Sequence, residues 1–160
     1  MVWKTVVAIV GLGLVAGMRT FCAPALLSTH LARRQPQPGL GPPFGALASR
    51  RAATLLSLLA MGELAGDKLP MTPARIEPPG LAGRALSGAL VGTTLAETEG
   101  LPHATGALLG GLAALGGAFA AYHLRRQIGQ RTRVPDPVLG GVEDAIAVGG
   151  GYALLEATTR

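Results

Sequence analysis

Apolar segments separated by short loops rich in Pro, Gly and Arg make up nearly the whole chain. The first apolar segment runs from Val6 to Ala32 and is interrupted at Met18-Arg19-Thr20. Its first part, residues 6–17, is too short to cross a bilayer alone, because about 20 helical residues are needed for the ~30 Å hydrocarbon core. Either this part tilts together with its flanks, or the chain reverses near Arg19.

Two loops divide the next part of the chain. Residues 33–45 contain four Pro and three Gly, a density of helix breakers that predicts a loop. A helix of about the length of a membrane span is predicted from Ala46 or Ser49 to about Asp67. Residues 71–80, with the sequence MTPARIEPPG, predict a second loop near the midpoint of the chain.

Three further apolar segments follow. The first begins at Arg84 and ends before Pro102. Residues 103–124 contain no formal charge over 22 positions and are the strongest candidate for a transmembrane helix. Residues 125–133 are predicted to form a basic loop, after which Asp136-Pro137 is typical of an N-cap with Pro at the first helical position.

The apolar segments divide into two similar halves. Residues 1–67 and 84–158 each contain three, if the two parts of the first segment on either side of Arg19 are counted separately. Residues 68–83 join the two halves as a linker. An odd number of crossings in each half would place the halves in opposite orientations, the inverted-repeat plan of many small transporters. The sequence thus predicts an all-α, polytopic membrane protein. It would form one membrane domain, 1–160, of about six membrane-embedded segments, some broken or re-entrant, in two inverted three-helix halves.

Composition points to the same class of protein. Hydrophobic residues make up 49% of the chain and charged residues only 14%, about half the usual share of a soluble protein. This excludes a disordered chain and disfavours an ordinary soluble domain. The 24 Gly and 27 Ala often recur four residues apart, as at Gly88/Gly92 and Gly106/Gly110, which allows helices to approach closely in lipid.

The net charge of +5 comes mainly from arginines at the ends of apolar segments. This position favours lipid headgroups as their partners rather than nucleic acid, which usually requires a continuous basic face or interleaved aromatic residues. The single cysteine, Cys22, excludes a disulfide within the chain. The N-terminal apolar segment could alternatively be a cleaved signal peptide.

Seven charged residues are predicted to gather at one end of a six-segment bundle. Glu63 and Asp67 are four residues apart and share a helix face, and Glu143-Asp144 lie inside the last segment. Ionisable groups within a membrane span are costly and usually point inward, paired or lining a wet cavity. The set is Arg19, Glu63, Asp67, Lys68, Arg84, Glu143 and Asp144.

Two interpretations of this charged cluster remain open. In the first, the carboxylates bind a cation or proton and the arginines act as counter-ions or as an anion site. In the second, the charges pair with one another and only hold the helices together.

Other chemical signals are weak. Gly11, Gly13 and Ala16 fit a dinucleotide-binding fingerprint, but no acidic residue follows at the required distance and no alternating strands and helices surround it. The three His are scattered and Cys22 is alone, so we expect no metal and no cofactor. We expect no enzymatic activity, with an intramembrane enzyme that uses the carboxylates as the alternative.

Several of these residues carry a family resemblance. Gly17-Met18-Arg19-Thr20 with Pro24, the segment from Glu63 to Pro70, Arg84 before a Gly-rich segment, and Pro137 with Glu143-Asp144 resemble the signature of an uncharacterised family. It is the family numbered 4126 among the domains of unknown function. The resemblance covers nearly the whole chain and implies a small bacterial protein with several membrane spans. It implies no particular activity.

We therefore expect a multi-pass protein of the bacterial cytoplasmic membrane that is transporter- or channel-like. Its charged cluster would bind an ion, a proton or a small solute. The alternative is a structural or accessory membrane protein whose charge pairs hold its helices together or bind a partner protein. The expected partners are the lipid bilayer and an ion or small solute; the small-residue faces also allow a homo-oligomer, and nucleic acid is not expected.

Overall fold

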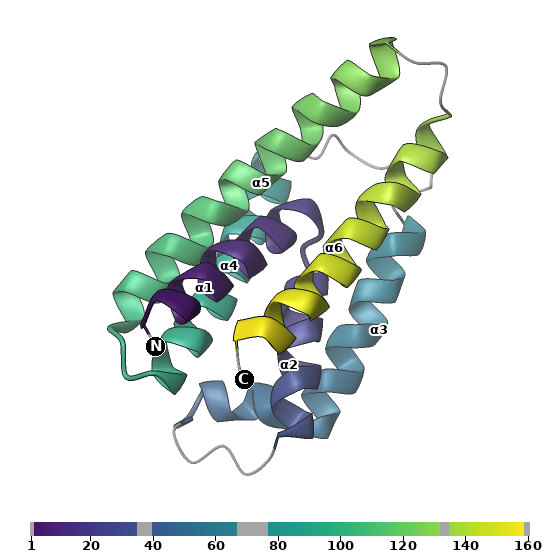
Figure 1. Ribbon diagram of the computed structural model, residues 1–160. Coiled ribbons are helices and arrows are strands. Elements are labelled where there is room, and N and C mark those ends of the chain that lie inside the picture. The colour runs from purple at the N-terminus through teal and green to yellow at the C-terminus, as the bar shows by residue number, and fades with distance from the viewer. Residues whose placement is uncertain (1, 35–39, 67–76, 132–134, 159–160) are drawn as a thin grey trace.

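The fold is a bundle of helices. The computed structural model describes residues 2–34, 40–66, 77–131 and 135–158, and every regular element within these ranges is helical (Figure 1). The prediction of an all-α protein is confirmed. The elements are α1 (Val2–Met18), α2 (Cys22–Arg33), the short 3-10 helix η1 (Phe44–Ala48), α3 (Arg50–Gly66), α4 (Pro78–Thr98), α5 (His103–Arg131) and α6 (Asp136–Thr158).

The first apolar segment forms two antiparallel helices that reverse direction at Arg19. Helix α1 is antiparallel to α6, because Arg19 at its end contacts Asp144 while Gly11 faces Leu154. Helix α2 runs in the same direction as α6, since His30 near its end lies close to Glu156. Residues 2–33 are therefore not one broken span. The 12 residues of α2 are roughly 18 Å long, less than the ~30 Å thickness of a bilayer core.

Helices α1, α4 and α5 pack with their backbones in contact, and glycine makes this possible. A Cβ atom added at Gly88 would overlap the carbonyl oxygen of Gly110, and one at Gly92 would overlap that of Gly106. Helix α1 approaches the same stretch of α5, where Gly17 lies directly against the backbone of Ala114. The prediction that small residues four apart allow close helix packing is confirmed for these three helices.

Helices α2 and α3 form a hairpin beside this glycine-rich core. They are joined through η1, and the hydroxyl of Ser28 on α2 donates a hydrogen bond to the carbonyl oxygen of Leu47 at 2.5 Å. Helix α3 packs mainly on α2 and η1, and Ala60 is its one buried residue. Helix α6 packs on α1 and α2 and barely touches α5.

Two predicted boundaries are wrong. The predicted basic loop 125–133 is helical as far as Arg131, because polar residues continue α5 and no proline follows until Pro135. The predicted loop 71–80 ends early, because α4 begins at Pro78: the first turn of a helix tolerates proline, whose missing N–H is not needed there.

The outer faces of the bundle are apolar. Large exposed hydrophobic side chains lie on α3 (Leu55, Leu58, Leu59 and Met61), on α4 (Leu86), on α5 (Leu108, Leu112 and Leu124) and on α6 (Val142, Ile146 and Tyr152). In the described part of the chain, α5 and residues Val138–Thr158 of α6 are long and apolar enough to cross a membrane. Helix α1 is apolar but shorter.

Candidate functional site

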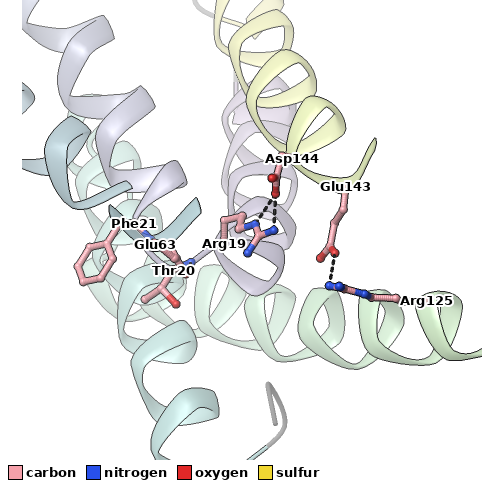
Figure 2. Close-up of polar contacts among 7 residues, drawn as sticks. All are labelled: Arg19, Thr20, Phe21, Glu63, Arg125, Glu143 and Asp144. Carbon is pink, nitrogen blue, oxygen red and sulfur yellow. Dashed lines mark hydrogen bonds and ion pairs between the residues drawn. The ribbon is translucent and has the colours of Figure 1, made fainter. Parts of the chain in front are cut away.

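A buried ion pair joins the turn between α1 and α2 to α6. The Nε atom of Arg19 donates to Oδ1 of Asp144 at 2.6 Å, and its Nη2 atom contacts the same oxygen (Figure 2). The Arg19 side chain is 2% exposed and that of Asp144 is 16% exposed. Asp144 lies about two turns inside α6, so this pair is within the apolar length of the helix rather than at its tip.

Glu63, near the end of α3, accepts hydrogen bonds from the backbone of the same turn. Its two carboxylate oxygens accept hydrogen bonds from the backbone N–H groups of Thr20 at 2.7 Å and Phe21 at 2.8 Å (Figure 2). Phe21 is the N-cap residue of α2 and makes no side-chain cap of its own. A negative charge at a helix N-terminus also interacts favourably with the helix dipole. Glu63 thus caps α2 from a different helix and fixes the place where the chain reverses.

Glu143 pairs with a residue of α5. Its Oε2 atom lies 3.6 Å from Nη1 of Arg125, and both side chains are more than three-quarters buried (Figure 2). Sequence reasoning missed Arg125 because it assigned this arginine to a loop. The signal was its place directly after the uncharged stretch 103–124.

Helix α4 brings Arg84 to the same end of the bundle. The hydroxyl of Ser87 donates to the carbonyl oxygen of Thr20 at 2.5 Å, so the first turns of α4 lie beside the reversal of the chain. Arg84 itself is buried, with 6% of its side chain exposed. Of the seven predicted residues, Arg19, Glu63, Arg84, Glu143 and Asp144 lie at this end, whereas Asp67 and Lys68 are outside the described residues.

A second set of polar side chains lies at the opposite end of α2. The Nδ1 atom of His30 is 3.9 Å from Oε1 of Glu156 on α6. Helix α6 is therefore linked to the α1–α2 segment by ionisable pairs at both ends. The sequence did not single out His30 and Glu156 as a pair, since nothing in their spacing shows that α2 and α6 run side by side.

A cavity of about 380 Å³ lies between these two ends, bordered by α2, α3 and α6. Its lining is mostly apolar and includes Leu26, Ala60, Leu64 and Val148. Among the described residues, no three His, Cys, Asp or Glu side chains lie close enough together to hold a metal ion.

These features define a class: a small, all-helical protein with two helices fit to cross a membrane and ion pairs buried between helices. A family model matches residues 6–158, and the chain belongs to the domain of unknown function family DUF4126. The resemblance noted from the sequence motifs is thereby confirmed. No curated protein and no solved structure matches the chain significantly.

Proposed function

We propose that the chain is a multi-pass protein of the bacterial cytoplasmic membrane. The support comes from how little of its apolar helices the bundle covers. Only 28% of the apolar window of α5 and 22% of that of α6 is buried within the protein. The core helix of a soluble protein would bury most of such a surface, because exposed apolar area is costly in water. Lipid is the environment that fits these helices.

We further propose that all six helices are membrane-embedded, in two inverted halves. Their directions support this: α1 and α4 are antiparallel, as are α2 and α5, and α3 and α6. These directions follow from which residues of each helix lie at the Arg19 end of the bundle (Figure 1). The lengths agree less well, since α2 has 12 residues and α5 has 29. In an inverted pair of this kind α2 would enter the membrane only part of the way.

Within this setting we propose that the protein is transporter- or channel-like and that the charged cluster at the Arg19 end binds an ion, a proton or a small solute. The observation that carries this proposal is the buried Arg19–Asp144 pair within the apolar length of α6. The glycine-rich core already holds α1, α4 and α5 together without charges. Ionisable groups kept inside a span despite their cost are by default candidates for function.

The way in which α6 is attached would allow this helix to move relative to the rest of the bundle. This helix barely touches α5, and its links to the rest of the bundle include the Arg19–Asp144 and Arg125–Glu143 ion pairs. Ion pairs can break and re-form when a bound ion or proton competes for one partner. Protonation of Asp144 would release α6 from the turn at Arg19, which is the kind of step that alternating access requires.

A structural role is the second candidate, and one specific observation favours it. Glu63 uses both of its carboxylate oxygens to cap α2, so in this conformation it stabilises the fold. In this interpretation the ion pairs fix the positions of the helices and transport nothing.

The first experiment measures flux in liposomes that contain the purified protein. Pyranine inside the liposomes reports proton entry, and light scattering reports uptake of Na⁺, K⁺ and Cl⁻ salts and of small neutral solutes. We expect flux with the wild-type chain, a loss of about tenfold or more with Glu63→Gln, and little change with Arg126→Gln, which neutralises an exposed charge at the same end. Absence of flux with the wild-type chain would overturn the transport proposal.

An exchange of charges separates the two candidate functions. The double variant Arg19→Asp/Asp144→Arg keeps opposite charges at the pair while reversing their positions. If the pair is only structural, this variant should regain the stability that either single change loses and any flux should be retained. If the pair is part of a binding site, the variant should fold and conduct nothing.

A further inference from the structure

The cavity between α3 and α6 is a groove with α2 as its floor. Helices α3 and α6 lie on either side of α2 and have almost no contact with each other (Figure 1). The groove runs along α2 from Cys22 to Arg34, and its volume of about 380 Å³ falls within the usual range for bound small molecules. Met61 on one wall and Tyr152 on the other are about half exposed, so the groove opens on the outer face of the bundle.

The length of the groove suits a single acyl chain. From Cys22 to Arg34 the helix rises roughly 18 Å, and one leaflet of a bilayer core is about 15 Å thick. Between Cys22 and Thr29 the side chains of α2 that line the groove carry no charge. The opposite walls there are lined by Ala60, Leu64 and Val148.

The charged lining is concentrated at one end of the groove. Arg33 and Arg34 line it there, together with His30 and Glu156. Both arginines are exposed, and they sit where α2 ends. Guanidinium groups bind phosphate oxygens in a bidentate manner, and two arginines and one carboxylate line this end of the groove; Arg34 also borders a second cavity that Glu99 lines.

From the apolar lining, the length and the arginines at one end, we propose that this groove binds an anionic phospholipid. The acyl chain lies along α2 between α3 and α6, and the headgroup phosphate is held by Arg33 and Arg34. This inference rests on the proposed membrane location but not on transport: a lipid bound here would fill the space between two helices that otherwise have almost no contact, whatever the charged cluster at the other end does.

The test uses the full chain in liposomes with a single tryptophan reporter. Trp3→Phe removes the native tryptophan, and Tyr152→Trp places a reporter in the groove wall. A matched control carries Phe119→Trp instead, an exposed position on α5 outside the groove. The quencher is phosphatidylglycerol brominated in its acyl chains, compared with brominated phosphatidylcholine of the same chains.

We expect phosphatidylglycerol to quench the reporter at position 152 at about tenfold lower mole fraction than phosphatidylcholine, and the two lipids to quench equally at position 119. Arg33→Gln/Arg34→Gln should abolish the preference. Arg50→Gln/Arg51→Gln should keep it, because these two arginines lie at the same end of the bundle, on α3, and do not line the groove.

Four outcomes would overturn the proposal. Equal quenching by both lipids at position 152 would mean ordinary boundary lipid, and equal loss in the two double-arginine variants would mean attraction by overall charge. Protection of position 152 from both lipids, together with a dimer in crosslinking, would mean that a second copy of the chain covers the groove. Full competition by inorganic phosphate alone would assign the arginines to a free anion.

Discussion

Arg19 is the residue on which the charged end of the bundle depends. Its guanidinium is almost fully buried and Asp144 supplies a carboxylate at 2.6 Å, so removing that carboxylate would break a buried ion pair. The sequence alone could place Arg19 near Glu143 and Asp144 but could not choose between them. The two acids are neighbours on one helix and point about 100° apart, so the choice depends on how α6 is rotated.

The arginine of the Arg19–Asp144 pair is 2% exposed and that of the Arg125–Glu143 pair is 24% exposed. This difference predicts unequal effects when the two neighbouring acids are substituted. Asp144→Asn should lower the free energy of unfolding by about 3–5 kcal/mol, because it breaks a buried pair. Glu143→Gln should lower it by a smaller amount, about 1–2 kcal/mol, because its partner Arg125 is 24% exposed, lies 3.6 Å away and can turn toward solvent when the carboxylate is lost. Unfolding in mild detergent by titration with SDS measures both. Equal losses for the two variants would contradict the assigned pairing.

At the scale of helices, the bundle uses two different ways of holding its parts together. Helices α1, α4 and α5 touch along their backbones through small residues, whereas α6 relies on ion pairs and on side chains such as Leu154 against Gly11. In lipid there is little hydrophobic force between helices, so close backbone packing has to supply the stability of the core.

The sequence predicted the apolar stretch of each helix but not the residues at which the helices begin and end. Apolar runs and small-residue spacing located the apolar part of every helix, because both properties are local. They left open whether the first stretch was one broken span or two helices that reverse near Arg19. The end of α5 at Arg131 and the start of α4 at Pro78 were missed, because a charged stretch or a proline pair is compatible with either a helix or a loop. Contacts with the rest of the protein decide whether such a stretch forms a helix or a loop, and the sequence does not show these contacts.

Two glycines of α5 differ in what surrounds them, and alanine substitutions at these two positions can be compared. Gly110→Ala places a methyl group into the carbonyl oxygen of Gly88, and we expect it to separate α4 from α5 at a cost of about 2 kcal/mol or more. Gly116→Ala on the same helix meets nothing within 4 Å and should raise the free energy of unfolding by up to about 1 kcal/mol, because alanine favours the helix. SDS titration again gives the values. Stabilisation by both changes would show that backbone contact is not needed.

At the scale of the molecule, the charged residues of the described chain gather at the two ends and apolar side chains cover the middle. Arg126 lies near the end of α5, Arg51 at the beginning of α3, and Leu112 on the exposed face of α5 between the two ends. If the long axis of the bundle crosses a membrane, the two arginines lie on opposite sides of it and Leu112 lies in lipid.

Cysteine labelling tests this arrangement. Because Cys22 is the one cysteine, a Cys22→Ala background allows single cysteines at Arg126, Arg51 or Leu112. In intact cells, a membrane-impermeant maleimide should label either Arg126→Cys or Arg51→Cys and leave the other unlabelled until the membrane is opened. Leu112→Cys should resist the reagent in both conditions. Labelling of all three positions in intact cells would argue against a membrane-spanning bundle.

The central place of α1 has a consequence for how the protein is made. During synthesis α1 emerges before the other five helices, yet the surface that fits Gly13 and Gly17 belongs to α5, nearly a hundred positions later in the chain. In the proposed membrane location, lipid or the insertion machinery has to cover this small-residue face of α1 until α5 arrives. We therefore expect the first three helices made alone to be unstable in the cell, and co-expression of the remaining three as a separate chain to rescue them.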